Sequence, residues 1–237
     1  MDSEVIERLQ SISLTEIEGK TIALNPSRRT QTLDDCSLSL VDRFLTTRDV
    51  NHRAAKNLLR SAWKLGNDLR IVDVGEGLYL FRFKLESQLQ WVQDSSPWSF
   101  DNHLLVMRRW KIGIAAHNMV FTHVPLWVQV YGLPFDLMTE ETFRDIRSEL
   151  GTMLMVKSKP IESDQARFLQ IRINIPLNQP LRRGSPVTNP EGGKFVVAFK
   201  YERLVGLCYT CRHLGHEKKN CTLHDPSPEQ QPNPYGE

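Results

Sequence analysis

The residues with the clearest chemistry lie near the C-terminus, in the segment 208–221. Three cysteines and one histidine follow the spacing C-x2-C-x4-H-x4-C, at Cys208, Cys211, His216 and Cys221. Structural Zn²⁺ sites hold the ion with four Cys or His ligands, and such a closed set leaves no open position for a reacting group. A chance cluster of reduced thiols is the alternative, but three of the four cysteines of the chain fall at ligand spacing. The segment therefore predicts one structural Zn²⁺.

This spacing is that of a zinc knuckle, a module used for single-stranded nucleic acid. Tyr209 follows the first ligand, where an aromatic ring can stack on a base, and such stacking contributes roughly 1–3 kcal/mol per base. Basic side chains nearby would meet phosphate and make binding depend on salt. Besides Tyr209, the residues expected to contact nucleic acid are the apolar Leu214 and the basic Arg212, Lys218, Lys219, Arg203 and Lys200.

Two residues of the segment need separate interpretation. His213 is a rival ligand, but C-x2-C-x-H spacing would make too tight a loop, so we expect His213 to be exposed. Many knuckles carry Gly after the second cysteine, where it relaxes the turn that aims backbone N–H groups at sulfur. Arg212 occupies that position here. We expect it to weaken the fold slightly without abolishing zinc binding.

Composition places the chain among ordinary globular proteins, with 237 residues, 40% of them hydrophobic and 24% charged. The net charge of +2 hides an uneven distribution, because residues 151–221 contain 12 basic and 5 acidic side chains. A local basic excess indicates a surface for phosphates. Reduced thiolate ligands imply the nucleus or cytoplasm. An apolar run of membrane-spanning length and an N-terminal secretory signal are both missing from the sequence, so no membrane association is expected.

Residues 36–111 predict an α+β domain with the order βαββαβ, which is ferredoxin-like or RRM-like. A strand is expected near 38–44, then a helix capped by Asn51 and ended by Gly66-Asn67, with Ala54, Leu58, Ala62 and Leu65 on one face and Ala55, Leu59 and Trp63 nearby. A hairpin over 69–83, a helix over 85–92 and a strand over 103–107 complete the pattern.

An RNA-reading sheet needs aromatic side chains on its open face. In the strand 78–83, Tyr79, Phe81 and Phe83 point one way and alternate with Leu78, Leu80 and Arg82. If the aromatic rings faced out, the core would be thin and Arg82 would be buried. We therefore favour an aromatic core, and we do not expect this sheet to bind RNA in the standard way.

Three blocks of sequence carry a family resemblance: Pro97-Trp-Ser-Phe-Asp101 with its following strand, Trp127-Val-Gln-Val-Tyr-Gly-Leu-Pro134, and the knuckle. In this order they resemble the plant domain of unknown function in ORF1-type (Gag-like) proteins of LINE retrotransposons and their host relatives. The resemblance covers roughly residues 37–221. It implies nucleic-acid binding without catalysis.

The remaining chain suggests the following organisation. Residues 1–35 are expected to be a flexible arm, 124–205 a second small α+β unit, 206–222 the CCHC zinc knuckle, and 223–237 a disordered Pro-rich tail. The second unit should hold a helix capped by Thr139, with Phe143, Ile146 and Leu150 buried, and strands over 153–156, 168–175 and 194–201.

Together these features predict a non-catalytic, zinc-dependent binder of single-stranded RNA or DNA with weak sequence preference. No Walker loop, G-x-S-x-G elbow or H-E-x-x-H motif is present, and no small-molecule substrate is expected. Self-association is left open. The alternative is a protein-interaction or self-assembly adaptor, in which the knuckle is only a structural staple.

Overall fold

The computed structural model describes residues 8, 11–25, 33, 36–157 and 168–222. The predicted tail and most of the predicted arm lie outside these residues. The chain divides into two units by its internal contacts. The first takes Met1–Phe44, Val50–Ser95 and Met107–Val120, and the second takes Leu45–Asp49, Ser96–Val106 and Phe121–Glu237.

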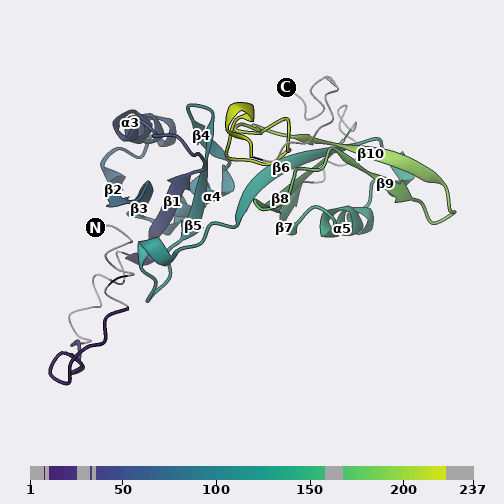
Figure 1. The fold of residues 1–237 in the computed structure, drawn as a ribbon. Helices are drawn as coiled ribbons and strands as arrows, with labels where there is room; N and C mark the ends of the chain where they lie inside the picture. The colour runs from purple at the N-terminus through teal and green to yellow at the C-terminus, as the bar shows by residue number, and fades with distance from the viewer. Residues whose placement is uncertain (1–7, 9–10, 26–32, 34–35, 158–167, 223–237) are drawn as a thin grey trace. The chain divides into compact units, whose positions relative to one another are not determined.

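Two antiparallel five-stranded sheets and three main helices make the described fold α+β, as predicted (Figure 1). The first sheet has the strand order β2-β3-β1-β5-β4. Its elements are β1 (Ser39–Phe44), α3 (His52–Trp63), β2 (Leu69–Gly75), β3 (Leu78–Phe83), α4 (Glu86–Asp94), β4 (Trp98–Phe100) and β5 (His103–Arg109). The expected βαββαβ order is therefore confirmed, with the short strand β4 added before the last strand.

The aromatic side chains of β3 form the core of the first unit. Tyr79, Phe81 and Phe83 are between 0% and 5% exposed. The indole ring of Trp63 on α3 packs edge-on against Phe81, with ring centroids 5.2 Å apart. The prediction of an aromatic core is confirmed, and these rings are not available to bases.

Helix α3 begins as predicted but buries a different face. The Asn51 side chain accepts a hydrogen bond from the backbone N–H of Ala54 at 3.0 Å, so Asn51 is the N-cap. The buried residues of α3 are Ala55, Leu59 and Trp63, whereas Leu58 is 48% exposed. The predicted apolar face through Ala54 and Leu58 is therefore not the buried face of α3. The helix instead buries the face that carries the large Trp63 ring. The helix also ends earlier than expected, at Lys64 in the left-handed region.

The second sheet has the strand order β7-β8-β6-β10-β9. Its elements are β6 (His123–Tyr131), α5 (Glu140–Ser148), β7 (Thr152–Lys157), β8 (Leu169–Pro176), β9 (Gly184–Thr188) and β10 (Lys194–Tyr201). The Thr139 hydroxyl accepts from the backbone N–H of Thr142 at 3.3 Å, which confirms the predicted N-cap of α5. Ile146 and Leu150 are buried as expected, and the side chain of Phe143 lies outside the described ones. Strand β9 was not predicted.

Side chains of β6 alternate strictly between two faces of the second sheet. Along β6 the buried residues are Val124, Leu126, Val128 and Val130. These residues share one hydrophobic core with Ile146 and Leu150, so α5 packs on this face. The opposite face of β6 carries the half-buried side chains of Pro125, Trp127, Gln129 and Tyr131.

Candidate metal centre and nucleic-acid interface

Backbone hydrogen bonds fold the Cys/His segment, residues 206–222, into a tight hairpin. The Cys208 carbonyl accepts from the N–H of Arg212 at 2.7 Å, and the Cys208 N–H donates to the carbonyl of His213 at 2.9 Å. Leu207 and Leu214 form an antiparallel bridge. This ladder turns the C-x2-C loop back on itself, so that Cys208 and Cys211 approach each other.

The structure brings the four predicted ligands together. One ligand atom from each of Cys208, Cys211, His216 and Cys221 lies within 4.8 Å of all the others. The Cys211 sulfur is 3.2 Å from Nε2 of His216. Zn–S bonds of about 2.3 Å place tetrahedral sulfurs about 3.8 Å apart. The Cys₃His donor set therefore fits one structural Zn²⁺.

His213, the rival ligand, is engaged elsewhere. Its Nδ1 donates to the carbonyl oxygen of Cys211 at 2.9 Å. We expected this side chain to be exposed, but it is half-buried, because the hydrogen bond holds the ring against the loop. The choice of His216 over His213 agrees with the cluster that the structure forms.

The two cysteines of the C-x2-C loop have opposite pKa shifts. Burial raises the pKa of Cys208, but the backbone N–H groups of Cys211 and Thr210 and the sulfurs of Cys211 and Cys221 together lower it below its usual value. For Cys211, burial comes first and the neighbouring sulfurs of Cys208 and Cys221 add to it, so its pKa rises to about 11 despite a backbone hydrogen bond from His213. Of these two thiols, Cys208 therefore loses its proton more easily, and the thiolate is the form of cysteine that binds a metal ion.

Arg212 adopts the backbone conformation that glycine would take at its position. Its φ is 63°, in the left-handed region where a Cβ atom crowds the backbone. This positive φ is the backbone strain that we expected from the sequence when Arg212 takes the place of Gly. Glycine would relieve the crowding but would remove one positive charge.

We expect Arg212→Gly to raise the free energy of unfolding by about 0.5–1 kcal/mol, because glycine carries no steric penalty at this φ. Thermal unfolding of the zinc-loaded chain would measure the gain. Arg212→Ala is the matched control, since it removes the charge and keeps the Cβ. If the two variants were equally stable, relief of backbone crowding would not be the cause.

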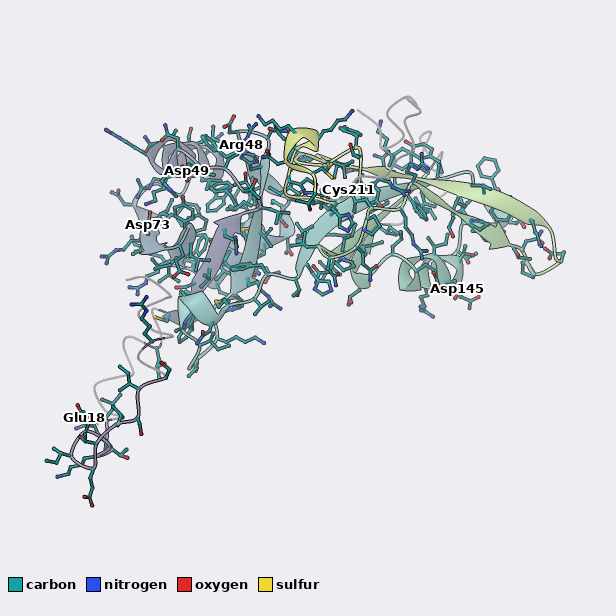
Figure 2. All side chains as sticks on the ribbon, viewed as in Figure 1. Glu18, Arg48, Asp49, Asp73, Asp145 and Cys211 are labelled. Carbon is teal, nitrogen blue, oxygen red and sulfur yellow. The ribbon has the colours of Figure 1, made fainter. Side chains whose placement is uncertain are left out.

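Close contacts fix the Cys/His segment within the second unit. Leu207 and Leu214 belong to the hydrophobic core of that unit. A Cβ built on Gly215 would lie 2.8 Å from Cγ of Leu45, so this position has room only for glycine. Arg48 forms an ion pair with Glu217 at 2.6 Å (Figure 2, where Arg48 and Cys211 are labelled). The segment is therefore a packed part of the unit.

The predicted nucleic-acid contacts divide by exposure. Tyr209 is 60% exposed, although it directly follows the fully buried Cys208. Arg203, Lys218 and Lys219 are exposed, whereas Arg212 and Lys200 are half-buried. Leu214 is only 8% exposed and packs in the core, so it does not belong to the outer surface of the segment. The expectation that Leu214 meets a base alongside Tyr209 is corrected accordingly.

Comparison with known families agrees with this geometry. Residues 175–223 match the family described as a zinc knuckle, and residues 32–118 match the family described as a domain of unknown function (DUF4283). The chain joins a DUF4283 domain to a CCHC zinc knuckle. No catalytic family was identified for either part. The matched zinc knuckle region includes β9 and β10 as well as the Cys/His segment.

The chain is similar to the uncharacterized protein At4g02000 of Arabidopsis thaliana, with 29% identity over 125 residues. The alignment covers 53% of this chain and 39% of that protein, so the chain spans well under half of its relative.

Solved structures similar to this chain include two RNA-binding proteins. They are the N-terminal three RNA binding domains of the yeast splicing factor Prp24 (9% identity) and the RNA binding domain of Hrp1 in complex with RNA (18% identity). Each has a TM-score of 0.25. The match to Prp24 covers 59% of this chain and 54% of the Prp24 chain. The match to Hrp1 covers 58% of this chain and 81% of the Hrp1 chain. Among the described residues, no helix is long and apolar enough to cross a membrane.

Proposed function

We propose that this protein is a non-catalytic, zinc-dependent binder of single-stranded RNA or DNA with weak sequence preference. The observation that carries the proposal is the position of Tyr209, whose ring is 60% exposed beside the buried ligand Cys208. An apolar ring held outward on a basic segment suits a nucleobase, because every base offers a π-face and sequence matters little.

In this proposal Cys208, Cys211, His216 and Cys221 hold one Zn²⁺, which keeps the short loop folded. Tyr209 then stacks on a base with little loss of conformational entropy. The exposed Lys218 and Lys219 meet phosphates of the strand. Glu217, which lies 3.4 Å from Lys219 and is paired with Arg48, limits the positive charge at this end.

We also propose that the chain is of the ORF1-type, Gag-like class of LINE retrotransposon proteins. The order of the Pro97-Trp-Ser-Phe-Asp101 block, the Trp127–Pro134 block and the knuckle supports this assignment. Sequencing the genomic locus would test it, because an origin in such an element predicts a reverse-transcriptase reading frame or its remnant downstream.

Tyr209→Ala should weaken binding to a fluorescein-labelled single strand by about 5- to 150-fold, which corresponds to the 1–3 kcal/mol of one stacked base. Fluorescence anisotropy on RNA and DNA strands of equal sequence would measure the loss. Binding should also fall with salt, with a logarithmic slope of about −0.7 for each phosphate contacted.

Trp91→Ala is the matched control, because Trp91 on α4 is also a large exposed ring, at 46%. It should leave the affinity unchanged. Salt-insensitive binding, or equal losses in the two variants, would reject a specific role for Tyr209.

A second candidate function is a protein-interaction or self-assembly adaptor with the knuckle as a staple. The packing of Leu207 and Leu214 in the unit's core and the Arg48–Glu217 ion pair favour it, since they give the metal a structural role on their own. The two functions differ in one measurement. The adaptor requires wild-type protein that is folded and zinc-loaded and yet binds neither RNA nor DNA at low salt.

A further inference from the structure

The second sheet has a face that α5 does not use, and its chemistry differs from that of the first sheet. We define the platform face as the side chains of Gln129, Tyr131, Phe168, Gln170, Ala198 and Lys200, which come from β6, β8, β10 and the residue before β8. Cross-strand register places Tyr131 opposite Ala198, and Gln129 opposite both Lys200 and Gln170. Directly opposed residues point to the same side of a sheet.

Two aromatic rings lie together on the platform face. The rings of Tyr131 and Phe168 are 5.1 Å apart between centroids and tilted by 37°. The Tyr131 hydroxyl donates to Oε1 of Gln129 at 2.7 Å, which fixes the orientation of the ring. Tyr131 thus stands on β6, the central strand of the sheet, where a stacking ring is most effective.

The polar side chains of the platform face are held by one carboxylate. Nε2 of Gln129 and Nε2 of Gln170 each donate to Oε1 of Glu202, both at 2.6 Å. Each amide nitrogen carries a second hydrogen, and the carbonyl oxygen of Gln170 can accept a bond. Such fixed amide groups suit the hydrogen-bonding edges of bases. The negative charge of Glu202 disfavours phosphate at the same point, so phosphates are directed toward Lys200.

Two residues of β10 on the side of Tyr131 are exposed. Ala198 is small and exposed, and Val196, two residues earlier on the same face, is 71% exposed. Beyond the other end of β10, which closes at Tyr201, the chain runs through Glu202 and the exposed Arg203 to Cys208. The basic side chains of Lys200 and Arg203 therefore lie on the segment that joins the platform face to the knuckle.

We propose that the platform face is a second binding site for bases of the same single strand, with Tyr131 as the stacking ring and the amides of Gln129 and Gln170 as base contacts. This inference rests on the proposed function, because the strand must also engage the knuckle. It assigns to the second sheet the role that the first sheet cannot perform with its rings buried.

Ala198→Glu tests the proposal, because it adds a carboxylate beside Tyr131 at an exposed position and spares the core. We expect affinity for a strand of about 16 nucleotides to fall roughly tenfold or more, and affinity for one of about 4 nucleotides to stay unchanged, since the knuckle alone can hold the short strand. Leu58→Glu on α3, 48% exposed, is the matched control for the added charge and should bind both strands as wild type does.

Tyr131→Phe and Tyr131→Leu separate stacking from folding. The Phe variant keeps the ring and should bind the long strand within about twofold of wild type. The Leu variant should lose about tenfold on the long strand only, at unchanged zinc content. On irradiation, a long strand that contains 5-iodouracil should become crosslinked to the peptide that contains Tyr131.

The outcomes distinguish this inference from the proposed function. If Tyr209→Ala weakens binding while Ala198→Glu and Tyr131→Leu behave like the control, the platform face is not a nucleic-acid site and the knuckle proposal stands. If Ala198→Glu or Tyr131→Leu lowered the affinity for short and long strands equally, the substitution would be acting on the knuckle, and the platform-face proposal would be overturned. If Ala198→Glu changed the sedimentation coefficient and not the affinity, the face would bind a second copy of the chain. Wild-type protein that binds neither strand would reject both proposals.

Discussion

Cys221→Ser is expected to abolish stoichiometric zinc binding. Cys221 is a buried member of the Cys₃His cluster, and its loss leaves three donors. Removal of a group that only orients a ligand costs about 10–100-fold in metal affinity, so removal of a ligand should cost more. Metal analysis after dialysis against a weak chelator should show about one zinc per wild-type chain and close to none for the variant. Strand binding should fall with it.

The loss of structure should be local to the second unit. Apparent zinc-binding free energies of about 10–16 kcal/mol in small fingers are folding free energies, so the Cys/His segment should unfold without metal. Backbone amides of residues 206–222 should exchange quickly with solvent after chelation, while β1 and β3 keep their protection. Cys36→Ser is the matched control, because Cys36 does not belong to the metal cluster. Protection lost equally across β1 and β3 would contradict a loss of structure that is confined to the second unit.

The first unit and the ligand set were predictable because their signals are local. Alternation along β3 and the volume of its rings decided which face is the core, and Tyr79, Phe81 and Phe83 are buried as expected. Fixed spacing decided the ligands, since few loop geometries bring Cys208, Cys211 and His216 together. Arg212 was recognised as a departure because many knuckles carry Gly at its position, and its φ of 63° gives the physical reason for that Gly.

What the sequence did not reveal depends on contacts between distant residues. Strand β9 contains Pro186 and is short, so its strand character comes from pairing with β10. The core position of Leu214 depends on packing within the second unit, and in the sequence it looks like any apolar residue of a loop. The platform face requires Tyr131, Gln129 and Gln170 to be adjacent, and only the register of β6 with β8 and β10 determines that.

Asp42 is expected to make the protein less stable as the pH rises. It lies on β1, opposite Tyr79, with 0% exposure, and neither carboxylate oxygen has a hydrogen-bond partner among the residues that the structure describes. Burial raises its pKa well above the usual value near 3.8. The native state then holds a proton that the unfolded chain releases above about pH 4. The free energy of unfolding should therefore fall from about pH 4 upward, until the pH passes the native pKa.

Asp42→Val should be more stable than wild type at pH 7 by on the order of 1–3 kcal/mol, because it removes an unpaired buried polar group and suits a strand. Asp42→Asn is the matched control, since it keeps the shape and cannot titrate. His52, which contacts the Tyr79 hydroxyl, and Lys56, whose Nζ is 5.2 Å from the Tyr79 ring centroid, remain in both variants. Urea unfolding between pH 4 and 8 should give flatter stability profiles for both variants than for wild type. A slope retained in Asp42→Asn would assign the pH dependence to a group other than Asp42, because only this carboxylate has been removed.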